Sequence, residues 1–263
     1  MTLRFSLRAL HILLCALSAG CNSASFSTTA ERNASVAPYA NEKVGQLSLR
    51  DFLLARSFLA VDNTKATVGI GSAAAIDRRG YLLTAAHALD SKDTPLQLLS
   101  MGSSPALNHI LQPQVVWRGD VAKNQPDLAI LYVGIPLTEI FEWAPEPKNG
   151  GLVFAVGPIY DKNMTTVSYS YAAGRLQDFS RQSKLVPPTT RFDHSAPIHG
   201  GDSGGPLATM DGRLLGINTE VFLAFLGWHY GRAIRPDLDW LRQIIDEDFS
   251  KRSASKGAGP ASN

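Results

Sequence analysis

The stretch GGDSGGPL, residues 200–207, is the most informative part of the chain because it sets a single serine, Ser203, among four glycines. A serine hydroxyl is a weak nucleophile at neutral pH and needs a base within hydrogen-bond reach. It also needs backbone N–H groups directed at a developing oxyanion, and glycines adopt the backbone conformations that such a turn requires. A plain glycine-rich β-turn would share this composition, so the base has to be sought elsewhere in the chain.

Two other segments supply the residue types that an activated serine needs. LLTAAHAL, residues 82–89, is an apolar run that ends in small residues before His87, and PDLAIL, residues 126–131, opens an apolar run with Asp127. A carboxylate at the start of a buried strand needs a partner, and a protonated histidine is one. A histidine alone is more often a core or capping residue, and an aspartate alone often starts a turn. In combination, these segments favour a catalytic triad.

Short apolar runs separated by Gly, Pro, Asn and Asp fill the chain around these segments. Runs of this length with turn residues between them are typical of an all-β barrel or sandwich. Helical spacing of apolar residues is visible only at 47–58 and, more clearly, at 237–249. The expected strands cover residues 67–76, 81–84, 114–117, 128–133, 152–156, 206–208 and 214–218.

The three motifs together resemble those of the trypsin and chymotrypsin family of serine proteases. TAAH at 84–87, DLA at 127–129 and GDSGGP at 201–206 match its histidine, aspartate and serine motifs, in the family's order. The compact spacing and the segment LGINT at 215–219 are similar to the bacterial HtrA branch. The resemblance spans roughly residues 67–245 and implies two antiparallel six-stranded β-barrels, about 47–144 and 147–236. The active site would lie between them, and a C-terminal helix would follow.

The resemblance also implies a role for each motif residue in a serine endopeptidase that acts on protein or peptide substrates. Ser203 would attack the scissile carbonyl, His87 would accept its proton, and Asp127 would orient the imidazole. The N–H groups of Gly201 and Ser203 would form the oxyanion hole. By alignment through the serine motif, the substrate pocket would be lined by Pro197, Ile198 and Asn218.

Two features depart from the family pattern. Zymogen members of the family pair the aspartate before the serine with a new Ile-Val-type terminus, and nothing equivalent stands ahead of residue 67. Asp202 must therefore find another partner or face solvent, and we expect no proteolytic activation step. The sequence after residue 236 is too short for the PDZ domain that HtrA proteins usually carry.

The composition gives no indication of nucleic acid or a cofactor. The formal net charge is only +2, and the Lys and Arg residues are scattered. No cluster of His, Cys and carboxylates has the spacing of metal ligands. His194 and His199 lie close to Ser203 in sequence, but as a lone pair they are better explained as loop or pocket residues. The sequence leaves the oligomeric state open.

The N-terminal 20 residues have the pattern of an export signal. Arg4 and Arg8 precede an apolar run at 9–17 and the small residues 18–20. Cys21 follows directly, in an arrangement that resembles the lipobox of bacterial lipoproteins, where this cysteine is acylated. Asn22 after it resembles the pattern of lipoproteins sent to the outer membrane. We expect a lipid-anchored protein of the bacterial cell envelope, and the alternative is a plain secretory signal with a periplasmic or secreted product.

Composition also divides the remaining chain. Residues 21–46 are rich in Ser, Thr, Ala and Asn and predict a flexible linker, and residues 250–263 predict a disordered tail. The protease-like domain is then expected at 47–249.

Two other functions stay open at this point. The glycines around Ser203 also fit the nucleophile elbow of α/β-hydrolase esterases, although that fold places its aspartate and histidine after the serine. The second is a catalytically silent two-barrel protein that binds partners in the cell envelope.

Overall fold

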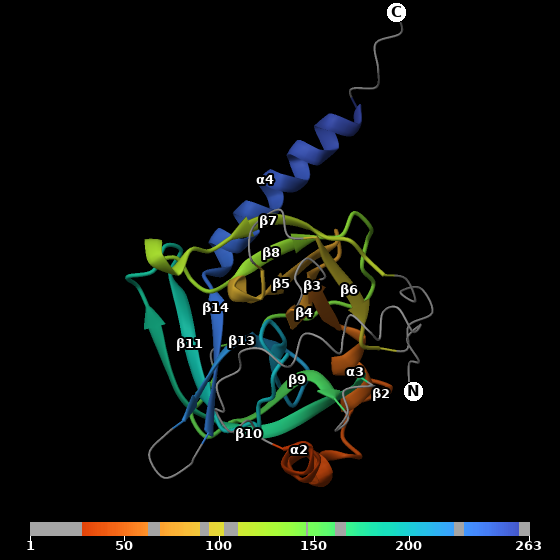
Figure 1. Ribbon diagram of the computed structural model, residues 1–263, viewed down its shortest axis with the longest axis vertical. Helices are drawn as coiled ribbons and strands as arrows, with labels where there is room; N and C mark the ends of the chain where they lie inside the picture. Colours follow the sequence, from red (N-terminus) through yellow and green to blue (C-terminus); the bar gives the residue numbers. More distant parts are fainter. Residues whose placement is uncertain are drawn as a thin grey trace, which may run out of the picture.

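The computed structural model describes residues 28–62, 69–89, 95–102, 110–145, 147–160, 167–223 and 229–257. Two antiparallel β-sheets lie against each other and form the body, and the long helix α4 (Leu238–Gly257) projects from it (Figure 1). The all-β class and the C-terminal helix expected from the sequence are confirmed. The central predicted strands are present in the structure with slightly different ends. The strand predicted at 67–76, for example, is β4, which spans Gly69–Asp77.

The first sheet contains six strands in the order β6-β3-β4-β5-β8-β7. Its centre is fully buried, since every side chain of β5 and β8 lies inside the protein. Such runs lack a polar face because both sides of the strand are covered. The strands are β3 (Ser57–Asp62), β4 (Gly69–Asp77), β5 (Tyr81–Thr84), β6 (Leu96–Ser100), β7 (Gln114–Arg118) and β8 (Ala129–Tyr132).

The second sheet is a closed six-stranded barrel in the order β10-β11-β14-β13-β12-β9. Its longest strand, β10, pairs with β9 at one end and with β11 beyond a bulge near Leu176. The strands are β9 (Leu152–Tyr160), β10 (Val167–Gln182), β11 (Thr189–His194), β12 (Pro206–Thr209), β13 (Leu214–Leu223) and β14 (His229–Pro236).

Only one of the two expected barrels is closed. In the first sheet β6 and β7 are the edge strands, and among the described residues a single bridge joins Leu98 of β6 to Leu111, which lies before β7. The prediction of two six-stranded antiparallel sheets is confirmed, and the first of them is a half-barrel in the described part of the chain. The physical reason is that closure requires continuous ladder pairing between the two edge strands, and one bridge does not provide it.

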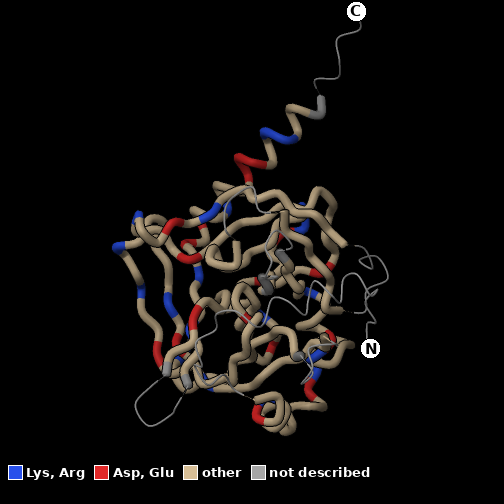
Figure 2. Tube along the Cα trace, viewed as in Figure 1, with Lys and Arg blue, Asp and Glu red and all other residues tan. Residues whose placement is uncertain are grey.

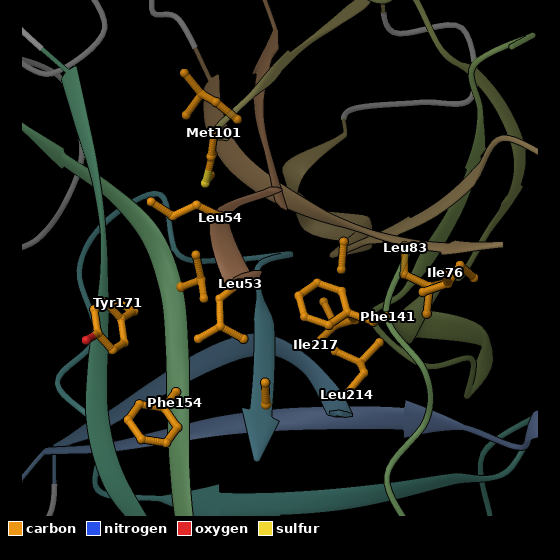
Figure 3. Packing of buried hydrophobic residues seen from close by; sticks show 14 of the residues in the cluster. Leu53, Leu54, Ile76, Leu83, Met101, Phe141, Phe154, Tyr171, Leu214 and Ile217 are labelled. Carbon is orange, nitrogen blue, oxygen red and sulfur yellow. The ribbon is translucent and has the colours of Figure 1, made fainter. Parts of the chain in front are cut away.

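The largest buried cluster joins the two sheets. Figure 3 shows members of this cluster from three parts of the fold: Leu53 and Leu54 of helix α3 (Leu49–Ala55), Ile217 of the barrel and Leu83 of the first sheet. Phe141, on the connection between the sheets, lies in the same cluster and is almost fully buried. Because this cluster is shared, the two sheets are fixed against each other, and so are the loops at their junction.

The described part of the predicted linker is folded, so the prediction of a flexible 21–46 segment is wrong from residue 28 onward. Thr28 and Glu31 form a capping box at the start of α2 (Thr29–Val36), and their contacts are 2.5 and 3.2 Å. The turn η1 (Ala37–Tyr39) follows, and Tyr39 packs edge-on against Phe154. The short strands β1 (Lys43–Val44) and β2 (Leu47–Ser48) then lead into α3. Helix α2 lies against β10 (Figure 1).

The predicted tail is also partly helical, because α4 continues to Gly257 instead of ending near 249. The helix packs on the first sheet: Trp240 contacts Trp117 edge-on, and the Arg252 guanidinium lies 4.2 Å from the Tyr132 ring centroid. Arg252 also pairs with Asp248 one turn earlier. These contacts extend the helix beyond its apolar stripe. Among the described helices, none has the length and apolarity to cross a membrane.

Charged residues of both signs are interspersed along the trace (Figure 2). Several of them pair across strands, as Arg232 does with Asp193 and Glu220.

Candidate active site

His87 lies on a single helical turn, η2 (Ala86–Ala88), directly after β5. Ala85 and Ala86 are buried, and their small side chains let the turn pack closely on the sheet. Arg118 of β7 holds the turn from the other side. Its guanidinium donates to the carbonyl oxygen of Leu89 at 2.8 and 3.1 Å and to that of Ala86 at 3.2 Å.

Asp127 fixes both the backbone and the side chain of His87. Strands β5 and β8 pair with Thr84 opposite Ala129, and this register brings residue 127 beside residue 87. Asp127 Oδ2 lies 2.6 Å from His87 Nδ1, and Oδ1 accepts the backbone N–H of His87 at 2.8 Å. The hydrogen bond to Asp127 raises the pKa of His87 above its usual 6.5, although burial opposes the shift. With Nδ1–H directed at the carboxylate, Nε2 is the nitrogen left to exchange protons elsewhere.

Ser203 lies at the centre of a turn, residues 199–204, which we call the Ser203 turn. Its backbone needs glycine on both sides, since φ is +93° at Gly201 and +85° at Gly204. Ser72 of β4 anchors the turn to the first sheet. The Ser72 N–H donates to the Ser203 carbonyl oxygen at 2.7 Å, and the Ser72 hydroxyl donates to the Gly201 carbonyl oxygen at 2.7 Å.

The two halves of the site meet beside Gly71 and Gly204. A Cβ added at Gly71 would lie 3.1 Å from the Ser203 carbonyl oxygen and 3.2 Å from Cβ of Ala88, the neighbour of His87. A Cβ at Gly204 would lie 2.3 Å from the Thr84 hydroxyl and 2.9 Å from the Ala85 nitrogen. The structure thus brings the Ser203 turn against the segment that carries His87.

The backbone N–H groups of Gly201 and Ser203 are both without an acceptor among the described residues. The neighbouring N–H groups are engaged, since Asp202 donates to the His199 carbonyl oxygen at 3.2 Å and Gly204 to that of Asn218 at 2.7 Å. The N–H groups of Gly201 and Ser203 are the donors expected from the sequence to form an oxyanion hole.

Of the three expected pocket residues, two are buried beside a histidine. Ile198 and Asn218 are 5% and 2% exposed, and Pro197 is half-buried. Asn218 Oδ1 lies 3.0 Å from His194 Nε2, and burial lowers the pKa of His194 to about 4. The neutral imidazole therefore donates to Asn218 from Nε2. Gly231 lies directly against this ring, because a Cβ there would be 2.3 Å from His194 Cε1.

No three His, Cys, Asp or Glu side chains gather as possible metal ligands in the part of the chain that the structure describes.

The sequence matches the model of the trypsin-like peptidase domain over residues 71–217, a range that contains His87, Asp127 and Ser203. The chain belongs to the trypsin-like peptidase family.

Relatives of this trypsin-like domain carry the names of serine endoproteases. It is 25% identical over 191 residues to a "Probable periplasmic serine endoprotease DegP-like" of Halomonas elongata, covering 72% of this chain and 37% of that protein. It is 30% identical over 160 residues to serine endoprotease DegS of Escherichia coli K12, covering 58% of this chain and 40% of the relative. The chain thus spans less than half the length of these relatives.

Solved structures show the same fold. The HtrA-type protease AlgW with a tripeptide superposes with a TM-score of 0.57 at 22% identity, over 74% of this chain and 62% of the other. The active form of the Rv3671c protease from M. tuberculosis superposes with a TM-score of 0.52 at 19% identity, over 82% and 88%.

Sequence reasoning found no partner for Asp202, and in this trypsin-like domain its partner is Arg32 of α2. Arg32 Nη1 lies 2.5 Å from Asp202 Oδ2, and both side chains are completely buried. Two features of the sequence pointed toward this pair: the capping-box pattern at Thr28 and Glu31 predicts a helix, and Asp202 needed a partner. Cys21 and the expected signal segment lie outside the described residues.

Proposed function

We propose that this trypsin-like domain is a serine endopeptidase in which Ser203, His87 and Asp127 act as a triad. The observation that carries the proposal is the pair of contacts from Asp127 to His87, 2.6 Å to Nδ1 and 2.8 Å to the backbone nitrogen. This arrangement holds the imidazole with Nε2 available as a base, beside a glycine-rich turn in which two backbone N–H groups have no acceptor among the described residues.

The proposed reaction proceeds in two halves through an acyl-enzyme. Ser203 Oγ attacks the scissile carbonyl carbon while His87 Nε2 takes its proton, and the carbonyl oxygen becomes an oxyanion bound by the N–H groups of Gly201 and Ser203. Protonated His87 then gives the proton to the leaving amine, and the C–N bond breaks. Water attacks the acyl-enzyme with His87 as base, and Ser203 is regenerated. Asp127 stabilises the imidazolium throughout without becoming protonated.

The fold argues against one of the two alternative functions but not against the other. An α/β-hydrolase requires a largely parallel sheet with helical crossovers, and both large sheets described here are antiparallel. A silent two-barrel binding protein shares the fold and is distinguished by reactivity alone.

The decisive experiment is labelling with a fluorophosphonate, which reacts readily only with an activated serine. Wild type and Ser253→Ala, which removes an exposed serine of α4, should label and cleave peptides alike. Ser203→Ala should do neither, with kcat lowered by roughly 10⁶. Unchanged labelling of Ser203→Ala, or a wild type that never labels, would leave the binding protein as the better explanation.

For specificity, we propose cleavage after small or medium apolar residues. Pro197, Ile198 and Asn218 would line the pocket, and none carries a charge that could compensate a buried Lys or Arg head group. The position of His194 against Gly231 supports a shallow pocket, because the ring fills space that Gly231 would otherwise leave. A peptide-library profile dominated by Lys or Arg at the cleaved position would contradict this.

For location, we propose export and a lipid anchor at Cys21, in the outer membrane of a bacterial envelope. The DegP-like relative is named periplasmic, which supports export. Because α2 is folded, only residues 22–27 separate Cys21 from the capping residue Thr28, and six residues reach about 20 Å when fully extended. The domain would therefore act close to the membrane surface. Cys21→Ser should move the protein into the soluble fraction, whereas equal fractionation of both forms would indicate a plain secretory signal.

A further inference from the structure

A completely buried ion pair connects the first described helix to the residue before Ser203. Arg32 and Asp202 are 170 positions apart in sequence, and their charged atoms lie 2.5 Å apart. Asp202 Oδ2 also accepts the His199 backbone N–H at 2.8 Å. Arg32 reaches the same loop again, with Nη1 3.3 Å from His199 Nδ1. The Ser203 turn is thus held by a residue from outside both sheets.

Helix α2 is itself anchored to the barrel strand β10. Arg32 Nη2 donates to the Ser170 carbonyl oxygen at 3.3 Å, and the Ala173 N–H donates to the Ser35 hydroxyl at 3.0 Å. Ser35 in turn donates to the Arg32 carbonyl oxygen at 2.7 Å. The Arg32 guanidinium therefore has a fixed position relative to the barrel, and it can set the position of Asp202.

The Arg32–Asp202 ion pair leaves two buried polar atoms without a hydrogen bond in the described part of the chain, so stability alone does not account for it. Arg32 Nε and Asp202 Oδ1 are both buried without a partner among the described residues. A buried ion pair that leaves polar atoms unsatisfied contributes little to folding compared with apolar packing, but it does select one geometry. Gly157 of β9 leaves room for this geometry, since a Cβ there would lie within bonding distance of Asp202 Oδ1.

The geometry of the Arg32–Asp202 pair affects the orientation of two backbone N–H groups, those of Gly201 and Ser203. Asp202 stands between Gly201 and Ser203, so fixing its side chain restrains the peptide groups on both sides. We propose that Arg32 is a positioning residue: α2, docked through the Arg32–Asp202 pair, holds the Ser203 turn in the shape that directs the Gly201 and Ser203 N–H groups at the substrate oxyanion. This proposal rests on the proposed function, because it assigns Arg32 a role in that same reaction.

The proposal is tested by kinetics of full-length Arg32→Met, Arg32→Lys and Arg50→Met. Arg50 is the matched control, because it also belongs to the N-terminal helices and donates to the neighbouring β10 carbonyl, that of Tyr169, at 3.0 Å, but its ion pair is exposed. Arg32→Met should lower kcat roughly 10²-fold, as loss of an oxyanion donor does. KM should stay within about threefold, because Arg32 does not touch substrate. Arg32→Lys should fall between Met and wild type, and Arg50→Met should match wild type.

A second measurement does not depend on turnover. Amide hydrogen exchange at residues 199–204 should be faster in Arg32→Met than in wild type, and unchanged in Arg50→Met. Because Arg32→Met buries an unpaired carboxylate, Asp202→Asn is measured beside it; it removes the charge at nearly constant size and should also lose kcat and protection.

Failure of this inference is distinguishable from failure of the proposed function. If wild type labels with fluorophosphonate and Arg32→Met or Asp202→Asn keeps wild-type kcat or exchange, the positioning role is overturned and the protease remains. Arg32→Lys behaving no better than Arg32→Met would overturn the role of the charge. A wild type that does not label would overturn both.

Discussion

In the first sheet, His87 and Asp127 are held by each other and by adjacent strands. In the barrel, by contrast, the Ser203 turn depends on residues that are distant in sequence. The first half needs β5, β8 and one arginine of β7, all within a single sheet. The second half is held by Ser72 of the other sheet and by Arg32 of a helix outside both. Gly157 contributes only by being small. The base and its orienter are thus preset locally, and the nucleophile is set by long-range contacts.

The two halves also differ in exposure. The side chains of His87 and Asp127 are 48% and 15% exposed, while those of Arg32 and Asp202 are both 0% exposed. Water can replace a lost partner in the first half, so a substitution there should change chemistry more than folding. Water has no access to the Arg32–Asp202 pair of the second half, so a substitution there should affect both chemistry and folding.

Asp127→Asn should show the largest effect of three substitutions that test this comparison. We expect kcat to fall about 10⁴-fold, since an amide at this position favours the wrong imidazole tautomer. Thermal stability should change little, because the carboxylate is near solvent. Asp120→Asn, in an exposed cap on the same loop, is the control and should retain activity. Activity of Asp127→Asn within tenfold of wild type would remove Asp127 from the mechanism.

Gly157→Ala should have an intermediate effect and should lower both catalytic activity and stability. Its methyl group would overlap Asp202 Oδ1 and displace the carboxylate from Arg32. We expect a kcat lower by roughly 10² and a free energy of unfolding lower by about 1–3 kcal/mol.

The control for this change is Gly134→Ala, which also restricts a backbone but meets open space in an exposed turn of the first half. Its free energy of unfolding should be lower by only about 1 kcal/mol, and it should keep full activity. If both variants were equally active, the Ser203 turn would not depend on the position of Asp202.

The smallest effect concerns the pH dependence of kcat/KM. The reaction needs neutral His87, and the hydrogen bond to Asp127 raises the pKa of His87. Activity should therefore be lost on the acid side with an apparent pKa above the usual 6.5, and it should recover as pH rises. Glu220 adds a smaller raising effect across the junction of the two sheets.

Glu220→Gln should consequently move the acid limb to lower pH while leaving the maximal rate nearly unchanged. Asp211→Asn, an exposed carboxylate of the barrel paired with Arg213, is the control. An acid limb that moves to higher pH in Glu220→Gln would contradict a charge effect of Glu220 that raises the pKa of His87.

The positions of His87, Asp127 and Ser203 were predictable because each lies in a short motif whose neighbours have a local role. Small residues before His87 let its turn pack on the sheet, an apolar strand follows Asp127, and glycines flank Ser203 where φ is positive. The short apolar runs of the central strands, separated by turn residues, likewise predicted an all-β domain. Such signals act over a few residues, so they are visible in the sequence.

The folding of residues 28–46 and 250–257 was not predictable from the same signals, because these segments have little apolar periodicity. Helix α2 is stabilised by a capping box and by Arg32, whose partner is 170 positions away, and the end of α4 by ion pairs and a cation–π contact with the first sheet.

The sequence by itself determined the family, the strand-rich body and the three residues proposed as a triad, because motifs and short apolar runs are local properties of the chain. The tertiary structure alone decided that Asp202 is paired with Arg32 and that residues 28–46 belong to the folded body. The physical reason is that a buried charge must be compensated by whichever opposite charge the fold brings within reach, and sequence distance carries no information about that.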